Sequence, residues 1–114
     1  MAVRGVSLLL DGFFEIDLGM AVYLKSSYYG RKYLAAAKSM LVRTEEGNLL
    51  IDTGICDLPD RLAGFYNVQR KGHGIVSSLR SEDLTPNDID FVVNTHLHVD
   101  HSGNNSLFKR AKFY

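Results

Sequence analysis

The sequence has a single cysteine, no excess of charge of either sign and no long apolar run. Cys56 alone excludes a disulfide within the chain. Lys and Arg number 13 and Asp and Glu number 13, so no net positive field draws the chain to a polyanion such as nucleic acid. The early apolar run from Val6 ends at Asp11, short of the roughly 18 apolar residues that cross a bilayer. Because no targeting signal is visible either, we expect a cytoplasmic protein with neither a nucleic acid nor a membrane as partner.

The composition is that of a folded globular chain. Of its 114 residues, 46% are hydrophobic, including 6 Tyr and 6 Phe, which excludes disorder as the main state. A chain of this length buries roughly two thirds of its unfolded surface, enough for a core. The length therefore predicts one domain or part of one.

Local patterns predict strands first and then a mixture of helices and strands. Residues 6–10 and 12–16 favour two extended pieces, whereas residues 24–33 favour a loop or a sheet edge with tyrosines as its cover. Residues 39–44 and 48–52 favour two strands joined by a hairpin turn at 45–48. The uniformly apolar stretch 49–51 indicates a strand covered on both faces. Asp52 follows it directly, and a buried carboxylate there requires polar partners.

The second half of the chain favours a layered α/β fold. A helix is expected over about 74–80, with a start as early as residue 60 left open. Thr85-Pro86-Asn87-Asp88 has the pattern of a short helix start, with a hydroxyl cap followed by proline. A strand over 89–93 then enters the core. Strands, a helix and a further strand in this order predict an α/β (α+β) architecture.

Three of the four histidines lie within six residues, directly after that strand. In an extended chain His96 and His98 point to the same side, and Leu97 and Val99 are expected to point the opposite way into the core. Residues 102–105 permit a turn into a helix, and this bend can carry Asp100 and His101 round to a position beside the first pair. Imidazole with carboxylate suits zinc, and also iron or manganese. Without a cation, three imidazoles and a carboxylate are expensive to bury together.

Two other reactive side chains have less support as functional residues. His73 stands alone, and a lone histidine is more often a surface or core residue than a ligand. Cys56 follows Asp52-Thr53-Gly54, and we interpret it as packing or pocket wall rather than as a nucleophile.

The segment 96–101 resembles the His-x-His-x-Asp-His signature of the metallo-β-lactamase superfamily. Residues 49–54, which end in Asp-Thr-Gly, and residues 84–90 are similar to the segments that precede the signature in that family. Residues 94–104 are especially similar to the lactonase branch, which includes the N-acyl homoserine lactonases. The resemblance covers residues 39–114 well and the first 38 loosely.

The resemblance implies a role for each residue of the motif. His96 and His98 are the expected ligands of a first divalent metal ion, and Asp100 and His101 those of a second, with Zn²⁺ preferred and Fe or Mn possible. Asp100 is also the expected catalytic residue, because it touches the activated water. Asp52 is expected to orient the histidine loop through hydrogen bonds. The implied reaction is hydrolysis of a lactone or similar ester by metal-activated water.

The family domain is about twice this length, a four-layer αββα sandwich of two similar halves. Residues 1–114 are expected to form the N-terminal half, a mixed sheet with helices on one face. Each metal then has two ligands from this chain, whereas a catalytic zinc usually has three. A complementary C-terminal half or a homo-oligomer is therefore the expected partner.

Other interpretations stay open. A hydrolase of the same fold can act on a thioester, a β-lactam or an RNA phosphodiester, although zero net charge disfavours RNA. A redox di-iron relative is disfavoured because such members carry Glu where His98 stands. The third alternative is a truncated, non-catalytic module that associates with a partner chain.

Overall fold

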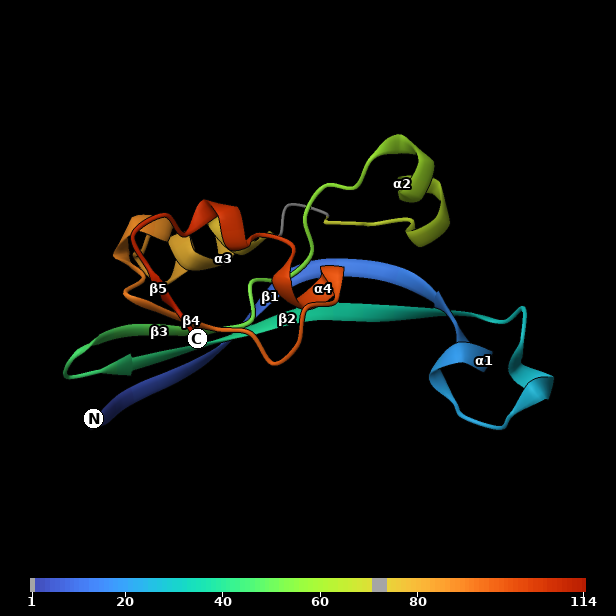
Figure 1. Cartoon of the computed structure of the whole chain (residues 1–114), viewed down its shortest axis with the longest axis horizontal. Helices are drawn as coiled ribbons and strands as arrows, with labels where there is room; N and C mark the ends of the chain where they lie inside the picture. Colours follow the sequence, from blue (N-terminus) through green and yellow to red (C-terminus); the bar gives the residue numbers. More distant parts are fainter. Residues whose placement is uncertain (1, 71–73) are drawn as a thin grey trace.

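The computed structural model describes residues 2–70 and 74–114, so His73 lies outside the described residues. The elements follow one another in a strand-rich order (Figure 1): β1 (Val3–Asp17), α1 (Leu18–Ala21), η1 (Ser26–Tyr28), β2 (Lys32–Thr44), β3 (Gly47–Ile51), α2 (Asp60–Tyr66), α3 (Ile75–Ser81), η2 (Pro86–Asp88), β4 (Phe91–Val93), α4 (Val99–Ser102), η3 (Asn105–Leu107) and β5 (Lys112–Phe113). The η elements are single turns of 3-10 helix.

The described strands form one mixed sheet of five strands in the order β1-β2-β3-β4-β5. β1, β2 and β3 pair antiparallel, and the hairpin turn between β2 and β3 lies where the sequence predicts it. β4 pairs parallel with β3, and β5 pairs parallel with β4. The mixed α+β sheet predicted from the sequence is therefore confirmed.

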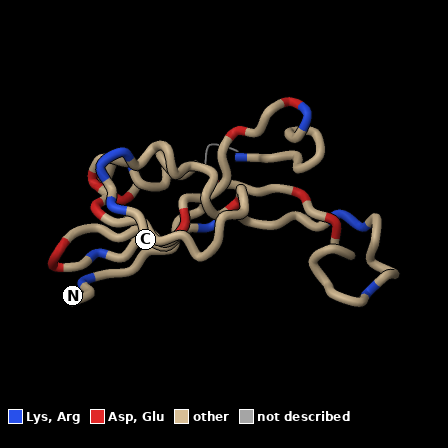
Figure 2. Tube along the Cα trace, viewed as in Figure 1, with Lys and Arg blue, Asp and Glu red and all other residues tan. Residues whose placement is uncertain are grey.

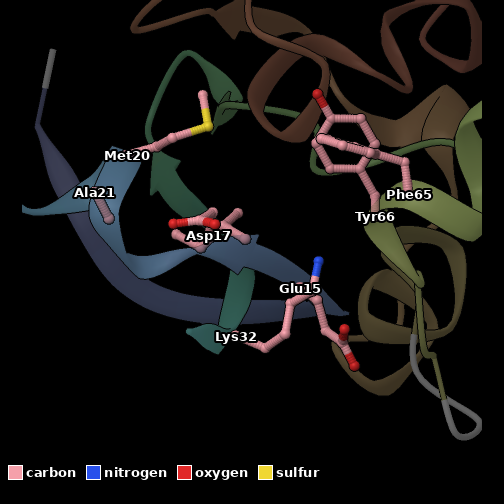
Figure 3. A pocket seen from close by; sticks show the side chains of 8 residues that line it. Glu15, Asp17, Met20, Ala21, Lys32, Phe65 and Tyr66 are labelled. Carbon is pink, nitrogen blue, oxygen red and sulfur yellow. The ribbon is translucent and has the colours of Figure 1, made fainter. Parts of the chain in front are cut away.

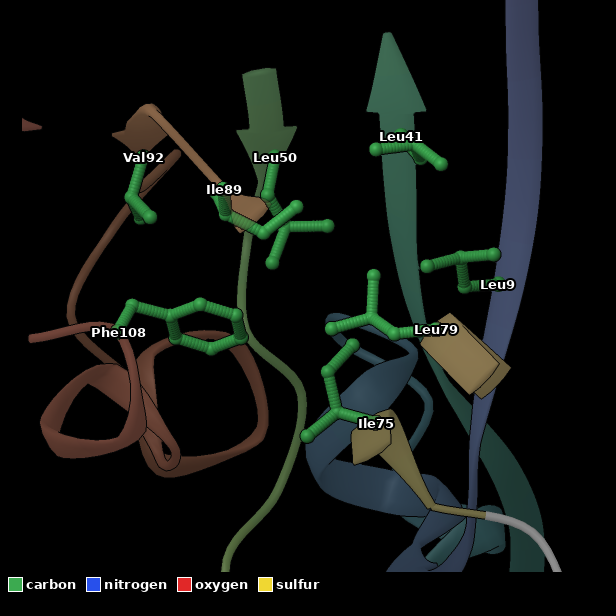
Figure 4. Close-up of a cluster of buried hydrophobic side chains, with 8 residues drawn as sticks. All are labelled: Leu9, Leu41, Leu50, Ile75, Leu79, Ile89, Val92 and Phe108. Atoms are coloured by element: carbon green, nitrogen blue, oxygen red, sulfur yellow. The ribbon is translucent and has the colours of Figure 1, made fainter. Parts of the chain in front are cut away.

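The helices α2 and α3 lie on one side of this sheet (Figure 1). The main core forms between α3 and the alternate strand residues that face it (Figure 4). Its buried side chains are Leu9, Leu41, Leu50, Ile75, Leu79, Ile89, Val92 and Phe108. Full burial of one such side chain contributes roughly 1.5–3 kcal/mol, so this cluster fixes α3 on the sheet.

The opposite face of the sheet is also apolar, but no described helix covers it. Leu8 is 67% exposed and pairs with Met40, which is 38% exposed. Leu49 and Ile51 point to this same face, since Leu50 between them enters the core. Both are half-buried, so the prediction that residues 49–51 are covered on both faces is wrong within the described part of the chain.

β1 is one continuous strand where the sequence favours two extended pieces. Its pairing with β2 shifts between Leu10 and Gly12, and Gly12 has φ of 121°. A bulge of this kind bends the strand without ending it. The β1–β2 connection carries α1 and η1 at the far tip of the molecule (Figure 1).

The region in which the sequence predicts one helix with an uncertain start contains two, α2 and α3. The short helix start at Thr85 is confirmed as η2, where the Asp88 carboxylate accepts the Thr85 N–H at 2.7 Å. This hydrogen bond lowers the pKa of Asp88 below its ordinary value. No helix in the described part of the chain is long and apolar enough to cross a membrane.

Candidate metal centre

The candidate site forms where two neighbouring parallel strands end. β3 is followed by Asp52 and β4 by the loop 94–98, and the Asp52 N–H donates to Val93 O at 2.8 Å. The carboxyl ends of parallel strands meet at one edge of a sheet, so residues far apart in sequence become neighbours there. This arrangement brings Asp52 to the histidine motif.

Asp52 is nearly buried and has the polar partners that its position requires. Its Oδ1 accepts the Thr95 N–H at 2.7 Å, and its Oδ2 lies 2.7 Å from His101 Nδ1 and 2.8 Å from Thr95 Oγ1. Burial alone would raise the pKa of Asp52, but the hydrogen bonds from His101 and Thr95 outweigh it and lower the pKa. Asp52 is therefore a carboxylate that only accepts hydrogen bonds.

The ionised Asp52 determines which ring nitrogen carries the proton on two histidines. His101 Nδ1 must donate to the carboxylate, which leaves Nε2 unprotonated in the neutral ring. The Thr95 hydroxyl has one proton and donates it to Asp52, so at 3.1 Å it can only accept from His96 Nδ1. His96 Nε2 is then unprotonated as well. In these neutral tautomers each ring has its lone pair at Nε2, as a metal ligand requires, and that of His101 faces Asp100 Oδ2 at 3.1 Å.

The structure brings the four motif residues together. The rings of His96 and His98 are 4.8 Å apart between centroids, and those of His96 and His101 are 4.0 Å apart. His101 Nε2 lies 3.1 Å from Asp100 Oδ2. His96 and His98 are exposed, whereas Asp100 and His101 are half-buried. The predicted neighbours are therefore close in space and reach the surface from one short loop and α4.

These donors fit a divalent metal in chemistry but do not enclose one. Among residues 2–70 and 74–114, no three His, Cys, Asp or Glu side chains form a group that could hold a metal ion. The side chains lie instead as a histidine pair, His96 with His98, and a mixed pair, Asp100 with His101. Imidazole nitrogens and a carboxylate are donors that suit zinc. The fit is that of a partial ligand set.

The orientation predicted for Leu97 is wrong. Leu97 is 78% exposed instead of buried, because residues 94–98 form a loop and the strand ends at Val93. The Thr95 N–H is bound to Asp52 instead of continuing the ladder. The helix also begins earlier than predicted, at Val99, with Asp100 and His101 inside its first turn.

A second loop lies behind the motif and supports it. The Thr53 N–H donates to His101 O at 2.8 Å, and the Gly103 N–H donates to Gly54 O at 3.0 Å. Asp52 has φ of 62° and Gly54 has φ of 74°, so the chain makes a tight left-handed turn after β3. These bonds fix the backbone of His101 as well as its ring.

A pocket of about 470 Å³ opens beside the motif. His98 and Asp100 contribute to its wall, and the rest of the lining is largely apolar: Phe14, Ile16, Met20, Ala35, Ala36, Ile55, Tyr66 and Val99. A second pocket of about 290 Å³ shares Ile16, Met20 and Tyr66 with it. Figure 3 shows Met20 on one side of this second pocket and the rings of Phe65 and Tyr66 on the other. The two pockets are therefore neighbours.

Thr95 was not predicted from the sequence as part of the site, and Cys56 was interpreted as packing or pocket wall. Thr95 lies directly before the motif, and its hydroxyl is one of the polar partners that the buried Asp52 requires, which was the available signal. Cys56 is a half-buried free thiol. Its backbone packs against Gly103, because a Cβ on Gly103 would lie 2.5 Å from the Cys56 backbone nitrogen.

The comparisons with known proteins agree with this geometry. The family model of the Metallo-beta-lactamase superfamily matches residues 34–114. A probable metallo-hydrolase of Methanocaldococcus jannaschii is 58% identical over 40 residues, which are 35% of this chain and 20% of that protein. An N-acyl homoserine lactonase of Bacillus thuringiensis is 31% identical over 78 residues, covering 60% of this chain and 31% of the lactonase.

A solved structure shares the fold of nearly the whole chain. It is an N-acyl homoserine lactone hydrolase with the product N-hexanoyl-L-homoserine bound at its catalytic metal centre. The TM-score is 0.79 at 24% identity, over 99% of this chain and 48% of the hydrolase. The chain thus spans about half the length of the solved structure that it matches.

A mixed sheet with helices on one face and a histidine loop at its strand ends defines a metallohydrolase-type fold. The family model covers most of the sequence. The chain belongs to the metallo-β-lactamase superfamily.

Proposed function

We propose that this chain is the metal-binding half of a hydrolase that acts on a lactone or similar ester. The observation that carries the proposal is the His96–His101 motif, held by the ionised Asp52 beside an apolar pocket. The relatives and the solved structure named above point to the same chemistry, and each of them is longer than the region it shares with this chain.

In this proposal His96 and His98 hold one metal ion, and Asp100 and His101 hold a second. Zn²⁺ is preferred because the donors are three imidazoles and one carboxylate, and Fe or Mn accept the same donors. A divalent metal at such a site supplies acidity to bound water and polarises a carbonyl oxygen. Asp52 keeps the His101 Nε2 and His96 Nε2 lone pairs available through the hydrogen bonds at Nδ1 and Thr95.

Asp100 is the proposed catalytic residue. Its carboxylate lines the pocket, and its Oδ2 lies 3.1 Å from His101 Nε2. From this place it can orient an attacking water and hold one of its protons, as a positioned carboxylate does in general base catalysis. No serine or thiol nucleophile is needed.

The pocket supports an ester with an apolar acyl group. Most of its lining is hydrocarbon, and the polar groups stand at the end where the motif lies. This is the usual arrangement of a small-molecule site, in which apolar walls bind and a few polar groups orient. Lys and Arg are interspersed with Asp and Glu along the chain (Figure 2), which favours an uncharged substrate over RNA.

The sheet face opposite α3 supports the assignment of residues 1–114 as one half of a sandwich. Val6 and Leu8 on this face are 58% and 67% exposed. An apolar sheet face requires a second layer to cover it. In the proposal a complementary C-terminal half packs there and contributes the remaining metal ligands, and a second copy of the chain is the alternative occupant.

Metal content tests the proposal directly. The chain is loaded with excess zinc at neutral pH, and bound metal is counted for the wild type, His96→Ala, His98→Ala, His101→Ala and the matched control His73→Ala. We expect zinc in the wild type and the control, and loss in the three motif variants. A wild-type chain that stays free of zinc would favour the non-catalytic module.

The substrate class is tested separately, on the zinc-loaded protein. Ring opening of N-hexanoyl homoserine lactone is compared with hydrolysis of a thioester, a β-lactam and an RNA oligonucleotide. Ala36→Phe should raise the KM for acyl lactones as the chain lengthens, because the larger side chain fills the pocket. Faster turnover of the thioester or the β-lactam would replace the lactone in the proposal.

A further inference from the structure

Asp11 lies outside the motif, yet it is buried more completely than Asp52. Its side chain is 0% exposed, at the point where the β1 pairing shifts. Burial raises the pKa of Asp11 from 3.8 to about 6, against the opposing effects of the Ile55 N–H and the Arg70 guanidinium. A buried carboxylate of this kind disfavours folding at neutral pH, so stability does not explain its presence.

The contacts of Asp11 lead to the loop after β3. Its Oδ2 accepts the Ile55 N–H at 2.5 Å, and Asn104 Nδ2 lies 3.5 Å from the same oxygen. The Ile55 carbonyl accepts from the Arg70 guanidinium, which also pairs with Asp57. Oδ1 of Asp11 has no hydrogen-bond partner in the described part of the chain. Both backbone polar groups of Ile55, its N–H and its C=O, are thus hydrogen-bonded by side chains.

Asn104 extends the contact to the loop that carries the motif. Its Nδ2 donates to Thr53 O at 2.8 Å, and its N–H donates to Thr53 Oγ1 at 3.2 Å. The Thr53 N–H in turn donates to His101 O. Asp11, Asn104 and Thr53 therefore form one polar connection, buried at Asp11 and Thr53, that ends at the backbone of His101.

The packing between the loop after β3 and the loop that carries the motif leaves no room for an added side chain. A Cβ on Gly54 would clash with Asp11 Oδ2, and one on Gly103 would come within 2.5 Å of Cys56 N. The carboxylate therefore lies directly against loop backbone. Because packed interiors transmit small displacements, a change at Asp11 will move both loops.

We infer that Asp11 is a positioning residue, which holds the loops 52–56 and 98–105 together behind His101. The inference rests on the proposed function, since positioning has a purpose only if the motif binds metal. Asp11 touches neither the motif side chains nor the pocket beside them, and it acts through the Ile55, Asn104 and Thr53 backbone and side-chain groups.

Amide hydrogen exchange of the metal-free chain is the first test, and it needs no activity. Asp11→Ala removes the acceptor, and Asp11→Asn keeps one. Asp90→Ala is a matched control, because Asp90 accepts the Asn48 N–H at 2.9 Å beside Gly47, away from the motif. We expect Asp11→Ala to speed exchange at Ile55, Thr53 and Gly103 by about tenfold relative to the β2–β3 ladder, with rescue by Asp11→Asn.

Zinc affinity, measured by competition with a chelator, is the second test. We expect Asp11→Ala to weaken it by about 10-fold, the lower end for residues that support metal ligands, and Asp90→Ala to change it less than twofold. If Asp11→Ala does not fold, Asn104→Ala takes its place, because it cuts the same connection. Faster exchange at Ile55 alone, or equal effects of Asp11→Ala and Asp90→Ala, would overturn the inference.

The two tests separate this inference from the proposed function. If the wild type binds no zinc, the proposed function fails, and selective exchange at Thr53 and Gly103 still shows that Asp11 holds the loops. If zinc binds but Asp11→Ala leaves both exchange and affinity unchanged, the proposed function stands and Asp11 has no positioning role.

Discussion

Replacement of Asp52 by asparagine should move a proton on His101. The asparagine side chain has one acceptor oxygen and one amide NH₂. Its oxygen is held at the Thr95 side, where the backbone N–H is 2.7 Å from Asp52 Oδ1. The NH₂ then faces His101 Nδ1, which must accept a hydrogen bond and so loses its proton to Nε2. The nitrogen proposed to bind metal becomes a donor and can no longer do so.

The size of the effect follows from the hydrogen bonds involved. To free Nε2 again, the Asp52→Asn variant must leave unmade one buried hydrogen bond, the one between the new amide and His101, which costs about 1–3 kcal/mol. Since about 1.4 kcal/mol is a factor of ten, zinc affinity should fall by about 5- to 150-fold. This range agrees with the roughly 10- to 100-fold effects found when residues that support metal ligands are changed.

The proton position is measured by nitrogen-15 NMR of the histidine rings in the metal-free chain, and the affinity by chelator competition. Asp90→Asn controls for the loss of one carboxylate elsewhere in the fold. A variant in which His101 keeps its proton on Nδ1 and zinc affinity changes less than twofold would refute the role that we assign to Asp52.

Three further predictions concern the ligands, the pH dependence and the tight turn. His98→Ala should abolish binding of the first metal and any hydrolysis while the circular dichroism spectrum stays unchanged, because His98 is exposed; full activity in this variant would remove His98 from the mechanism. Burial raises the pKa of Asp11 from 3.8 to about 6, so its contribution to stability is present below pH 3.8 and lost as the pH rises through 6. Asp11→Asn should remove a pH-dependent term on the order of 3 kcal/mol from the free energy of unfolding in urea, and identical pH profiles of variant and wild type would contradict this. Gly54→Ala should lower the free energy of unfolding by about 2–4 kcal/mol, because Gly54 has a positive φ and its Cβ would meet Asp11; an unchanged urea midpoint would argue against the packing described.

Local sequence rules sufficed wherever the structure depends on neighbouring residues. The hairpin between β2 and β3 follows from turn residues between two apolar runs, and η2 from the cap at Thr85. The need of Asp52 for partners follows from its place after three aliphatic residues, and the structure provides Thr95 and His101. The roles of His96, His98, Asp100 and His101 as metal ligands stay predictions, although the structure brings them together.

The same rules failed where distant contacts decide the conformation. Alternation along a strand places Leu97 in the core, but the hydrogen bond from Thr95 to Asp52, 43 residues away, ends the strand first. The hydrophobicity of residues 49–51 predicts that other elements cover both faces of this strand, but no described element covers the face opposite α3. Asp11 has the same pattern as Asp52, a carboxylate directly after an apolar run, yet its partner Ile55 is 44 residues away and donates only a backbone N–H.

The two buried carboxylates have different energetic consequences, and the difference bears on how the motif is prepared for metal. Asp52 has enough donors to stay ionised, and it orients the rings of His101 and, through Thr95, His96. Burial raises the pKa of Asp11, and the Ile55 N–H, the Arg70 guanidinium and the Ile75 N–H lower it without outweighing the burial. Because an ionised Asp11 opposes folding, the free energy that keeps the two loops in place must come from the hydrophobic core around α3. A chain that folds with these loops already held together presents His101 to a metal without the further entropic cost of ordering this residue.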